Sequence, residues 1–281
     1  MMLAKITGRQ QTILKLLYRY RFLNRIQIQT LMDHKDYRRI NAWLKDLKDK
    51  GYIERIYSTD FLEKTKPAIY YLGLNGIRWL SLQLAATKDG EEVPAYPLQE
   101  LRKRYRESSR SEGFKNRSML IADCCILLES ETTPDTRYVP IVHAQYIHPH
   151  HSFHFLAESE TIMPHLCVVK EHDTKNSRII TNYLLEVFDA TLPRYRLKYR
   201  LKQYLTYLSD DEWESGENDP PPIILLVCAN LTDLIYAKRR VKTLIDNEWD
   251  DEDQDKPHIR FTTAQQLKQH GITAKIWEEV R

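Results

Sequence analysis

The stretch DYRRINAWLKDLKDKGYI, residues 36–53, constrains the fold of this chain more than any other. Its apolar residues recur about every 3.6 positions, the spacing of a helix, and do not alternate as in a strand. The predicted apolar face comprises Tyr37, Ile40, Trp43, Leu44 and Leu47. Four polar side chains point elsewhere, with Arg38 and Lys45 opposite that face and Arg39 and Asn41 on its two shoulders. The sequence therefore predicts an amphipathic helix with one basic side.

The segments around this helix predict a compact arrangement of helices and a hairpin. Capping-box spacing marks two earlier helix starts, at Thr7 with Gln10 and at Asn24 with Gln27. Gly51 predicts a left-handed C-cap for the basic helix. Two strand candidates follow, at 53–57 and 69–72. The loop between them, STDFLEKTKPA, carries Lys64 and Lys66. This order predicts a winged helix-turn-helix over residues 1–85, with that loop as the wing.

The basic side of the predicted helix suits contact with duplex DNA. Arg and Asn side chains hydrogen-bond the edges of guanine and adenine in the major groove, and Lys contacts phosphates. We therefore expect DNA contacts from Arg38, Arg39, Asn41, Lys45, Lys64 and Lys66. The alternative is an ordinary amphipathic surface helix that binds nothing. The order of helices and hairpin favours DNA binding.

Composition and charge narrow the class of protein. With 281 residues and 42% hydrophobic residues, the chain can form one large or two ordinary domains. Residues 1–117 hold 24 Lys and Arg against 13 Asp and Glu, whereas the remainder holds 18 against 26. The basic first part is the expected partner of phosphates. The apolar runs are too short to cross a bilayer and the N-terminus lacks an apolar signal segment, so we expect a cytoplasmic protein without a membrane partner.

The second part of the chain predicts an α/β layer domain. Residues 86–97 are polar with two prolines and are interpreted as a linker, so the second domain is expected at 98–281. Its first segment, 98–117, is strongly basic and is either a second phosphate-contacting helix or a solvated face. Apolar strand candidates then alternate with helices up to the C-terminus. The four cysteines lie in apolar runs without a CxxC spacing, which indicates buried, reduced thiols.

The order of motifs resembles the replication-relaxation family of plasmid and mobile-element proteins. The resemblance is carried by Tyr71-Leu72-Gly73-Leu74-Asn75-Gly76, Pro164-His165, Leu185-Glu186-Val187-Phe188-Asp189-Ala190-Thr191 and Arg200-Leu201-Lys202-Gln203-Tyr204. Proteins of that family typically show Pro-Asp, Glu-x-Asp-x-Thr and Lys-Leu-x-x-Tyr at the last three places. The resemblance implies a second domain of the restriction-endonuclease-like, PD-(D/E)xK fold. It also implies a candidate site formed by His165, Glu186, Asp189, Arg200 and Tyr204.

This sequence keeps the Glu of a PD-(D/E)xK site, at Glu186, but departs from a cleaving site at the Asp and Lys positions. Such a nuclease holds a divalent metal with an Asp and a Glu and positions water with a Lys. Here His165 stands in place of the Asp, and Phe188 stands where the Lys belongs. Arg200 replaces the Lys of the Lys-Leu-x-x-Tyr pattern and holds its proton too tightly to act as a base. We therefore assign no catalytic residue and no cofactor, with Mg²⁺ reserved for the nuclease alternative.

Histidines cluster in the second part of the chain. Seven of the ten lie within residues 143–172, at His143, His148, His150, His151, His154, His165 and His172. Neutral imidazole is a good zinc ligand, but this spacing matches no standard zinc pattern. A polar turn between strands is the alternative interpretation, and no metal residue is assigned.

Three functions are compatible with these patterns. The first is a duplex-DNA-binding protein of a mobile element, acting in replication, transfer or regulation, with a non-cleaving second domain that contributes to shape, dimerisation or contact with a replication or transfer protein. The second is a metal-dependent DNA nuclease or nickase that uses Glu186 and Asp189. The third is a transcription regulator with an unrelated α/β sensor domain, which a pocket lined by convergent polar groups would favour.

Overall fold

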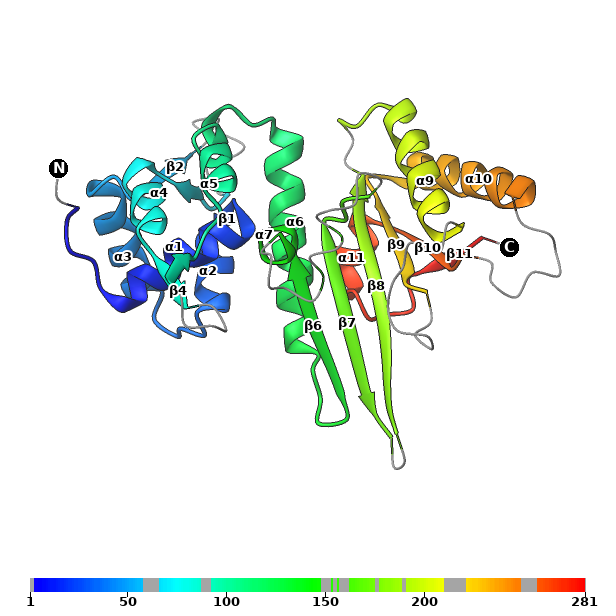
Figure 1. The fold of residues 1–281 in the computed structure, drawn as a ribbon, viewed down its shortest axis with the longest axis horizontal. Coiled ribbons are helices and arrows are strands. Elements are labelled where there is room, and N and C mark those ends of the chain that lie inside the picture. The colour runs from blue at the N-terminus through cyan, green and yellow to red at the C-terminus, as the bar shows by residue number, and fades with distance from the viewer. Residues whose placement is uncertain are drawn as a thin grey trace. The chain divides into compact units, whose positions relative to one another are not determined.

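A computed structural model of the chain describes residues 3–57, 66–86, 92–147, 153, 156, 162–174, 177–188, 191–209, 221–248 and 257–280. The chain divides into two compact units, residues 1–126 and 127–281. Figure 1 shows a helix-rich first part and a second part built on a long-stranded sheet. The expected α/β class is confirmed.

The first unit consists mainly of short helices with a small sheet. Its helices are α1 (Gly8–Tyr20), α2 (Arg25–Leu31), α3 (Tyr37–Asp49), α4 (Leu74–Ser81), α5 (Leu98–Arg104), the 3₁₀ turn η1 (Glu107–Ser109) and most of α6 (Glu112–Ser130). Its strands are β1 (Leu23–Asn24), β2 (Ile53–Ile56), β3 (Ile69–Leu72), β4 (Leu84–Ala86) and β5 (Glu92–Pro94). Strands β1, β3 and β2 form an antiparallel sheet in that order, and β4 pairs with β5.

The predicted caps define the helix ends of this unit. Thr7 with Gln10 and Asn24 with Gln27 both form complete capping boxes, so side chains satisfy amides that the helix itself leaves unpaired. After α3, Gly51 adopts a φ of +69°, and the Tyr52 amide donates to the Leu47 carbonyl at 2.9 Å. This confirms the predicted left-handed C-cap. The chain therefore leaves α3 in the direction that starts β2.

The apolar face of α3 is narrower than the sequence predicted. Ile40, Leu44 and Leu47 are buried, and Trp43 is partly buried against the ring of His34. Tyr37 lies on the predicted side, but its side chain is 50% exposed. It occupies the first position of α3, so its ring lies at the end of the buried row. Its ring also lies beneath the Arg25 guanidinium, 5.7 Å from the ring centre.

The second unit is built around one six-stranded sheet in the order β11-β10-β9-β8-β7-β6. Strands β8, β9 and β10 are parallel, and the remaining pairs are antiparallel. The strands are β6 (Thr136–Val142), β7 (Leu166–Asp173), β8 (Arg178–Phe188), β9 (Ile223–Cys228), β10 (Ile259–Thr263) and β11 (Glu278–Glu279). The helices are the end of α6, α7 (His143–Tyr146), α9 (Arg194–Ser209), α10 (Leu231–Glu248) and α11 (Ala264–His270).

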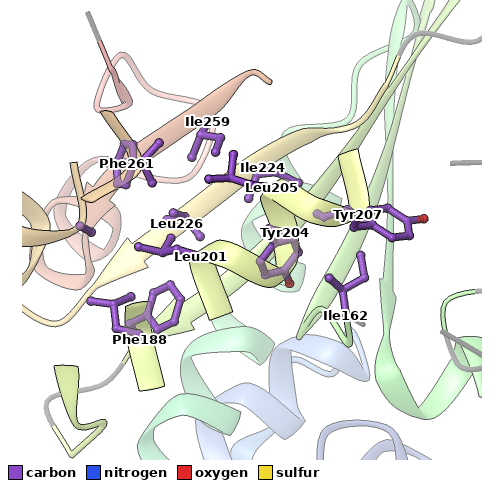
Figure 2. Close-up of a cluster of buried hydrophobic side chains, with 14 of the residues drawn as sticks. Ile162, Phe188, Leu201, Tyr204, Leu205, Tyr207, Ile224, Leu226, Ile259 and Phe261 are labelled. Atoms are coloured by element: carbon purple, nitrogen blue, oxygen red, sulfur yellow. The ribbon is translucent and has the colours of Figure 1, made fainter. Parts of the chain in front are cut away.

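Helices α9 and α10 lie side by side and cover one face of this sheet (Figure 1). Their apolar residues pack on alternate residues of the central strands, as the pleat of a sheet requires. Figure 2 shows this core, with Phe188 and Leu226 from the strands and Leu201 and Tyr204 from α9.

The four cysteines are buried thiols that form no disulfide, as predicted.

Helix α5 and most of α6 belong to the first compact unit, which therefore extends past the predicted linker at 86–97. The predicted domain limits themselves stay a prediction. Within the described ranges, every helix is too short or too polar to cross a membrane.

Candidate functional site

The first candidate site is the solvent-exposed side of α3. Asp36 caps this helix by accepting from the Arg38 amide at 2.8 Å, and a buried row from Ile40 to Leu47 fixes the opposite side. Near the end of α3, Asp46 accepts from the Gln10 side chain at 2.6 Å and from Lys50 at 2.7 Å. These two bonds lower the pKa of Asp46, Lys50 contributing more than Gln10. Helix α3 is thus anchored to α1 with its polar side left outward.

All four polar residues predicted on this helix are exposed: Arg38, Arg39, Asn41 and Lys45. Asn41 and Lys45 make no hydrogen bond or ion pair with any residue that the structure describes. Arg39 lies 3.7 Å from the Asp36 carboxylate, in a pair open to solvent that contributes little to stability. A ligand that binds the side chains on this surface would therefore displace solvent-exposed contacts alone, such as that of Arg39 with Asp36.

The predicted wing is only partly described. Lys64 lies outside the described residues, whereas Lys66 is exposed just before β3. Strands β2 and β3 pair in register, with Ile53 opposite Leu72 and Ile56 opposite Ile69. The loop that carries both lysines therefore connects the two strands of one antiparallel hairpin.

The basic segment 98–117 divides into α5, η1 and the start of α6, and part of its charge turns inward. Glu107 is 1% exposed and accepts from Arg21 Nε at 2.8 Å and from Arg104 Nη1 at 3.4 Å. Burial, followed by the charge of Arg104, lowers the pKa of Arg21 to about 10, and Glu107 opposes this shift. Arg104 is buried as well, so this cluster is a structural element of the unit.

The second candidate site is a polar cluster in the sheet unit, and it contains most of the predicted site residues. The register of β7 and β8, with Leu166 opposite Leu185, brings His165 beside Glu186. Glu186 is 1% exposed and accepts from Tyr204 Oη at 3.1 Å. Arg200 donates to the other carboxylate oxygen. Since Arg200 and Tyr204 are one helical turn apart on α9, both side chains reach the same carboxylate.

His165 completes this cluster from the edge of β7. Its Nδ1 accepts from the Val187 amide at 3.1 Å and lies 3.3 Å from Glu186 Oε2. Its own amide donates to the Leu185 carbonyl at 3.1 Å. Because Nδ1 accepts a backbone hydrogen bond, a neutral imidazole carries its proton on Nε2. Asp189, the fifth predicted member, lies outside the described residues.

Sequence reasoning missed one residue that supports the cluster. Tyr146 of α7 is fully buried, and its hydroxyl donates to the Pro164 carbonyl at 2.6 Å. This bond fixes the residue that precedes His165. Burial is the main cause that raises the pKa of both Tyr146 and Tyr204 well above its ordinary value, and the charge of Glu186 adds to it. Both hydroxyls therefore stay protonated and act as donors.

The position at which a cleaving site carries Lys is apolar. Phe188 is 2% exposed and points into the core on the same side of the sheet as Leu201 (Figure 2). Glu186 is the only carboxylate in the cluster among the described residues, and both its oxygens already accept hydrogen bonds. Mg²⁺ requires oxygen ligands at close to octahedral positions. The described residues therefore do not fit a magnesium site.

The histidine cluster is also only partly described. His148, His150, His151 and His154 lie outside the described residues. His143 packs its ring on Tyr146, and the His172 ring lies 2.9 Å from the Thr136 hydroxyl. No group of three metal-binding side chains occurs within the parts of the chain that are described.

The sequence matches a known protein family over most of its length. A family model described as replication-relaxation matches residues 14–219, a segment that includes α3 and the Glu186 cluster. Comparison with curated proteins gives no match.

Proposed function

Because the chain belongs to the replication-relaxation family, we propose that it is a duplex-DNA-binding protein of a plasmid, phage or other mobile element. It acts in replication, transfer or regulation of that element. The exposed polar side of α3 is the observation that carries this proposal. A second copy of the chain, or a replication or transfer protein, is the expected protein partner.

The proposal follows from the chemistry and order of the elements around α3. The order of α1, α2, α3 and the β2–β3 hairpin is the order expected of a winged helix-turn-helix, in which the third helix enters the major groove. Arg38, Arg39 and Asn41 carry donors suited to base edges, whereas Lys45 suits phosphate. The net charge of residues 1–117 favours association with DNA.

Duplex binding by α3 is tested with the Arg38→Ala/Arg39→Ala variant of the full chain. Affinity for duplex DNA should fall, and the slope of log affinity against log salt should fall by about 0.9 for each phosphate that the variant no longer neutralises. The matched control, Arg9→Ala/Lys15→Ala, removes the same charge from the exposed side of α1 and should bind nearly as the unaltered chain does. Equal affinity and slope for the two double variants would exclude α3 as the DNA-reading helix.

The wing lysines are expected to contact the DNA backbone without reading sequence. Replacing Lys64 and Lys66 with Ala should weaken binding to a preferred site and to random duplex by similar factors. Competition titrations with both duplexes measure the two factors. A loss restricted to one sequence would instead assign these lysines to base recognition.

We propose further that the sheet unit does not cleave DNA. A metal-bound water needs an anionic ligand set and a positioned base or cation. The Glu186 carboxylate is instead engaged by Arg200 and Tyr204, and Phe188 occupies the Lys position. The cluster is interpreted as a buried polar junction that ties β8 to α9 and β7.

Cleavage is tested by incubating the purified chain with supercoiled and linear DNA in Mg²⁺ or Mn²⁺. Both substrates should remain intact. Metal-dependent nicking by the unaltered chain that is lost in Glu186→Gln would reverse the proposal and establish the nuclease alternative. The Gln variant preserves the shape of the side chain, so a loss would reflect the carboxylate.

One observation favours the sensor alternative. A groove of about 680 Å³ lies between α10 and the C-terminal segment, with Lys238, Arg239 and Lys242 opposite Glu278 and Glu279. Lys238 pairs with Glu278 at 2.9 Å, so part of this charge is satisfied internally. The groove also lies outside the segment that matches the family, unlike α3. A regulator that responds to a small molecule would need its ligand to change duplex affinity.

A further inference from the structure

Helix α9 presents a solvent face that combines tyrosine rings with cations. Tyr195 is 68% exposed and Tyr199 is 64% exposed, and they lie one helical turn apart. Lys198 and Lys202 are exposed on the same side of the helix. Leu197 and Leu201 are buried on the opposite side. The two rings, one helical turn apart, place apolar surface together on one side of the helix, and clustered exposed apolar surface is typical of interaction sites.

This face is positively charged although the second half of the chain has an acidic surplus. Residues 191–209 include no Asp or Glu, and the acidic side chains are concentrated in 210–219 and 246–255. Lys198 and Lys202 make no ion pair with the residues described here. Arg194 at the start of α9 and Arg240 of α10 lie 5.1 and 5.5 Å from the ring of Tyr236, and Arg194 also lies 3.9 Å from the Asp233 carboxylate.

Exposed rings flanked by cations match the chemistry of a single nucleic-acid strand. Aromatic side chains stack on unpaired bases irrespective of sequence, and adjacent cations follow the phosphates. In a duplex the phosphates are exposed, but the base faces are stacked on one another. A duplex would therefore contact the lysines and make no stacking contact with the tyrosine rings. The spacing of Tyr195 and Tyr199, about 6 Å along the helix axis, places them in line for successive contacts along one strand.

We propose that this face of α9 binds single-stranded DNA, with Tyr195 and Tyr199 stacking on bases and Lys198 and Lys202 contacting phosphates. It is a second nucleic-acid site, in a different unit and for a different form of DNA than α3. A protein with both sites would hold duplex DNA at one unit and a single strand at the other.

The test measures binding of labelled oligothymidylate to the full chain by fluorescence anisotropy, with a duplex of equal length in parallel. The Tyr195→Ala/Tyr199→Ala variant should bind oligothymidylate at least about tenfold more weakly, since each stacking contact contributes a factor of this order or more. Its duplex affinity should be unchanged. Tyr195→Phe/Tyr199→Phe keeps both rings and should retain most of the affinity.

Charge is tested separately from stacking. Lys198→Gln/Lys202→Gln should lower the salt slope of oligothymidylate binding by about 0.7 for each phosphate that is no longer neutralised. Two controls in the same unit remove comparable exposed groups elsewhere. Ile179→Ala/Ile180→Ala removes exposed apolar side chains from β8, and Lys268→Gln removes an exposed charge from α11. Neither control should change binding of the single strand.

The outcomes separate this inference from the duplex proposal. Loss of duplex binding in Arg38→Ala/Arg39→Ala, with oligothymidylate binding retained, would support two independent sites. Absence of oligothymidylate binding by the unaltered chain would overturn the inference, as would equal affinity of the alanine and phenylalanine variants. Polyglutamate is tested in the same way. If it binds as tightly as oligothymidylate, and if the tyrosine variants do not change its affinity, the face is a docking surface for an acidic protein and the inference is wrong.

Discussion

The polar side of α3 and the Glu186 cluster use similar residue types in opposite ways. Arg38 of α3 is exposed and keeps its guanidinium outward, whereas Arg200 of α9 donates to a carboxylate that is 1% exposed. Charges in water are already solvated and cost little to leave unpaired, while a buried carboxylate needs partners. Sequence motifs identified both groups as candidate sites. Burial distinguishes a surface that can bind a ligand from a junction that stabilises the fold.

The largest effect should come from breaking the buried junction. Arg200→Ala leaves the Glu186 carboxylate buried without the guanidinium, with the Tyr204 hydroxyl still donating to it, which should lower the free energy of unfolding by about 3 kcal/mol. Chemical denaturation of the full chain measures this change. Lys202→Ala, two residues away on the exposed side of α9, should change it by less than about 0.5 kcal/mol. Equal effects of the two variants would mean that the pair with Glu186 has no structural role.

Loss of one neutral donor from the same junction should have a smaller effect. Tyr204→Phe removes the hydrogen bond to the Glu186 carboxylate and should cost about 1.5 kcal/mol at neutral pH. Tyr199→Phe removes an exposed hydroxyl and should cost nothing measurable. If both phenylalanine variants are as stable as the unaltered chain, the Tyr204 hydroxyl is not a partner that Glu186 requires.

Tyr204 also gives the junction a dependence on alkaline pH. Burial raises the pKa of Tyr204 well above its ordinary value of 10.0. The unfolded chain therefore releases this proton first, so the contribution is complete below about pH 10 and is lost as the pH rises further. In that range, stability of the unaltered chain should fall more steeply than that of Tyr204→Phe, by about 1.4 kcal/mol per pH unit. Parallel slopes for the two proteins would contradict this assignment.

Changes at the end of α3 should be smaller again. Gly51→Ala forces a side chain into the left-handed region at φ +69° and towards Asn75, which should cost about 1 kcal/mol. Gly8→Ala, at the start of α1 where a methyl group meets open space, is the matched control and should be nearly neutral. Thermal unfolding of the two variants measures the difference. An equal shift of the melting temperature in both would show that this turn does not require glycine.

The smallest effect on stability should come from the exposed side of α3. Arg38→Ala and Arg39→Ala should each change the free energy of unfolding by less than about 0.5 kcal/mol, because neither removes a buried contact. The same variants should weaken duplex binding. If one of these variants is both less stable and weaker in duplex binding, the exposed side of α3 has a structural role and the loss of binding is not evidence for a DNA contact. Denaturation and DNA titration must therefore be measured on the same preparations.

Local sequence signals determined the elements of this protein. Both capping boxes and the left-handed turn at Gly51 depend on neighbours within a few residues, so their patterns predicted them. The two strands of the hairpin were predicted from their own composition, although each pairs with a strand more than ten residues away. The motif order also selected His165, Glu186, Arg200 and Tyr204, which the register of β7 with β8 and one turn of α9 bring together.

Only the tertiary structure decided which side chains are covered and which charges are paired. Spacing placed Tyr37 on the apolar side of α3, where its side chain is half exposed. The sequence left open whether the basic segment that contains Arg104 contacts phosphates or lies in solvent, whereas Arg104 is buried. A count of charges made the second half of the chain acidic, although α9 carries an exposed basic face. Periodicity fixes the direction of a side chain relative to its own helix. Burial depends on segments distant in the chain, such as the contact between Glu107 and Arg21, and no local pattern encodes that contact.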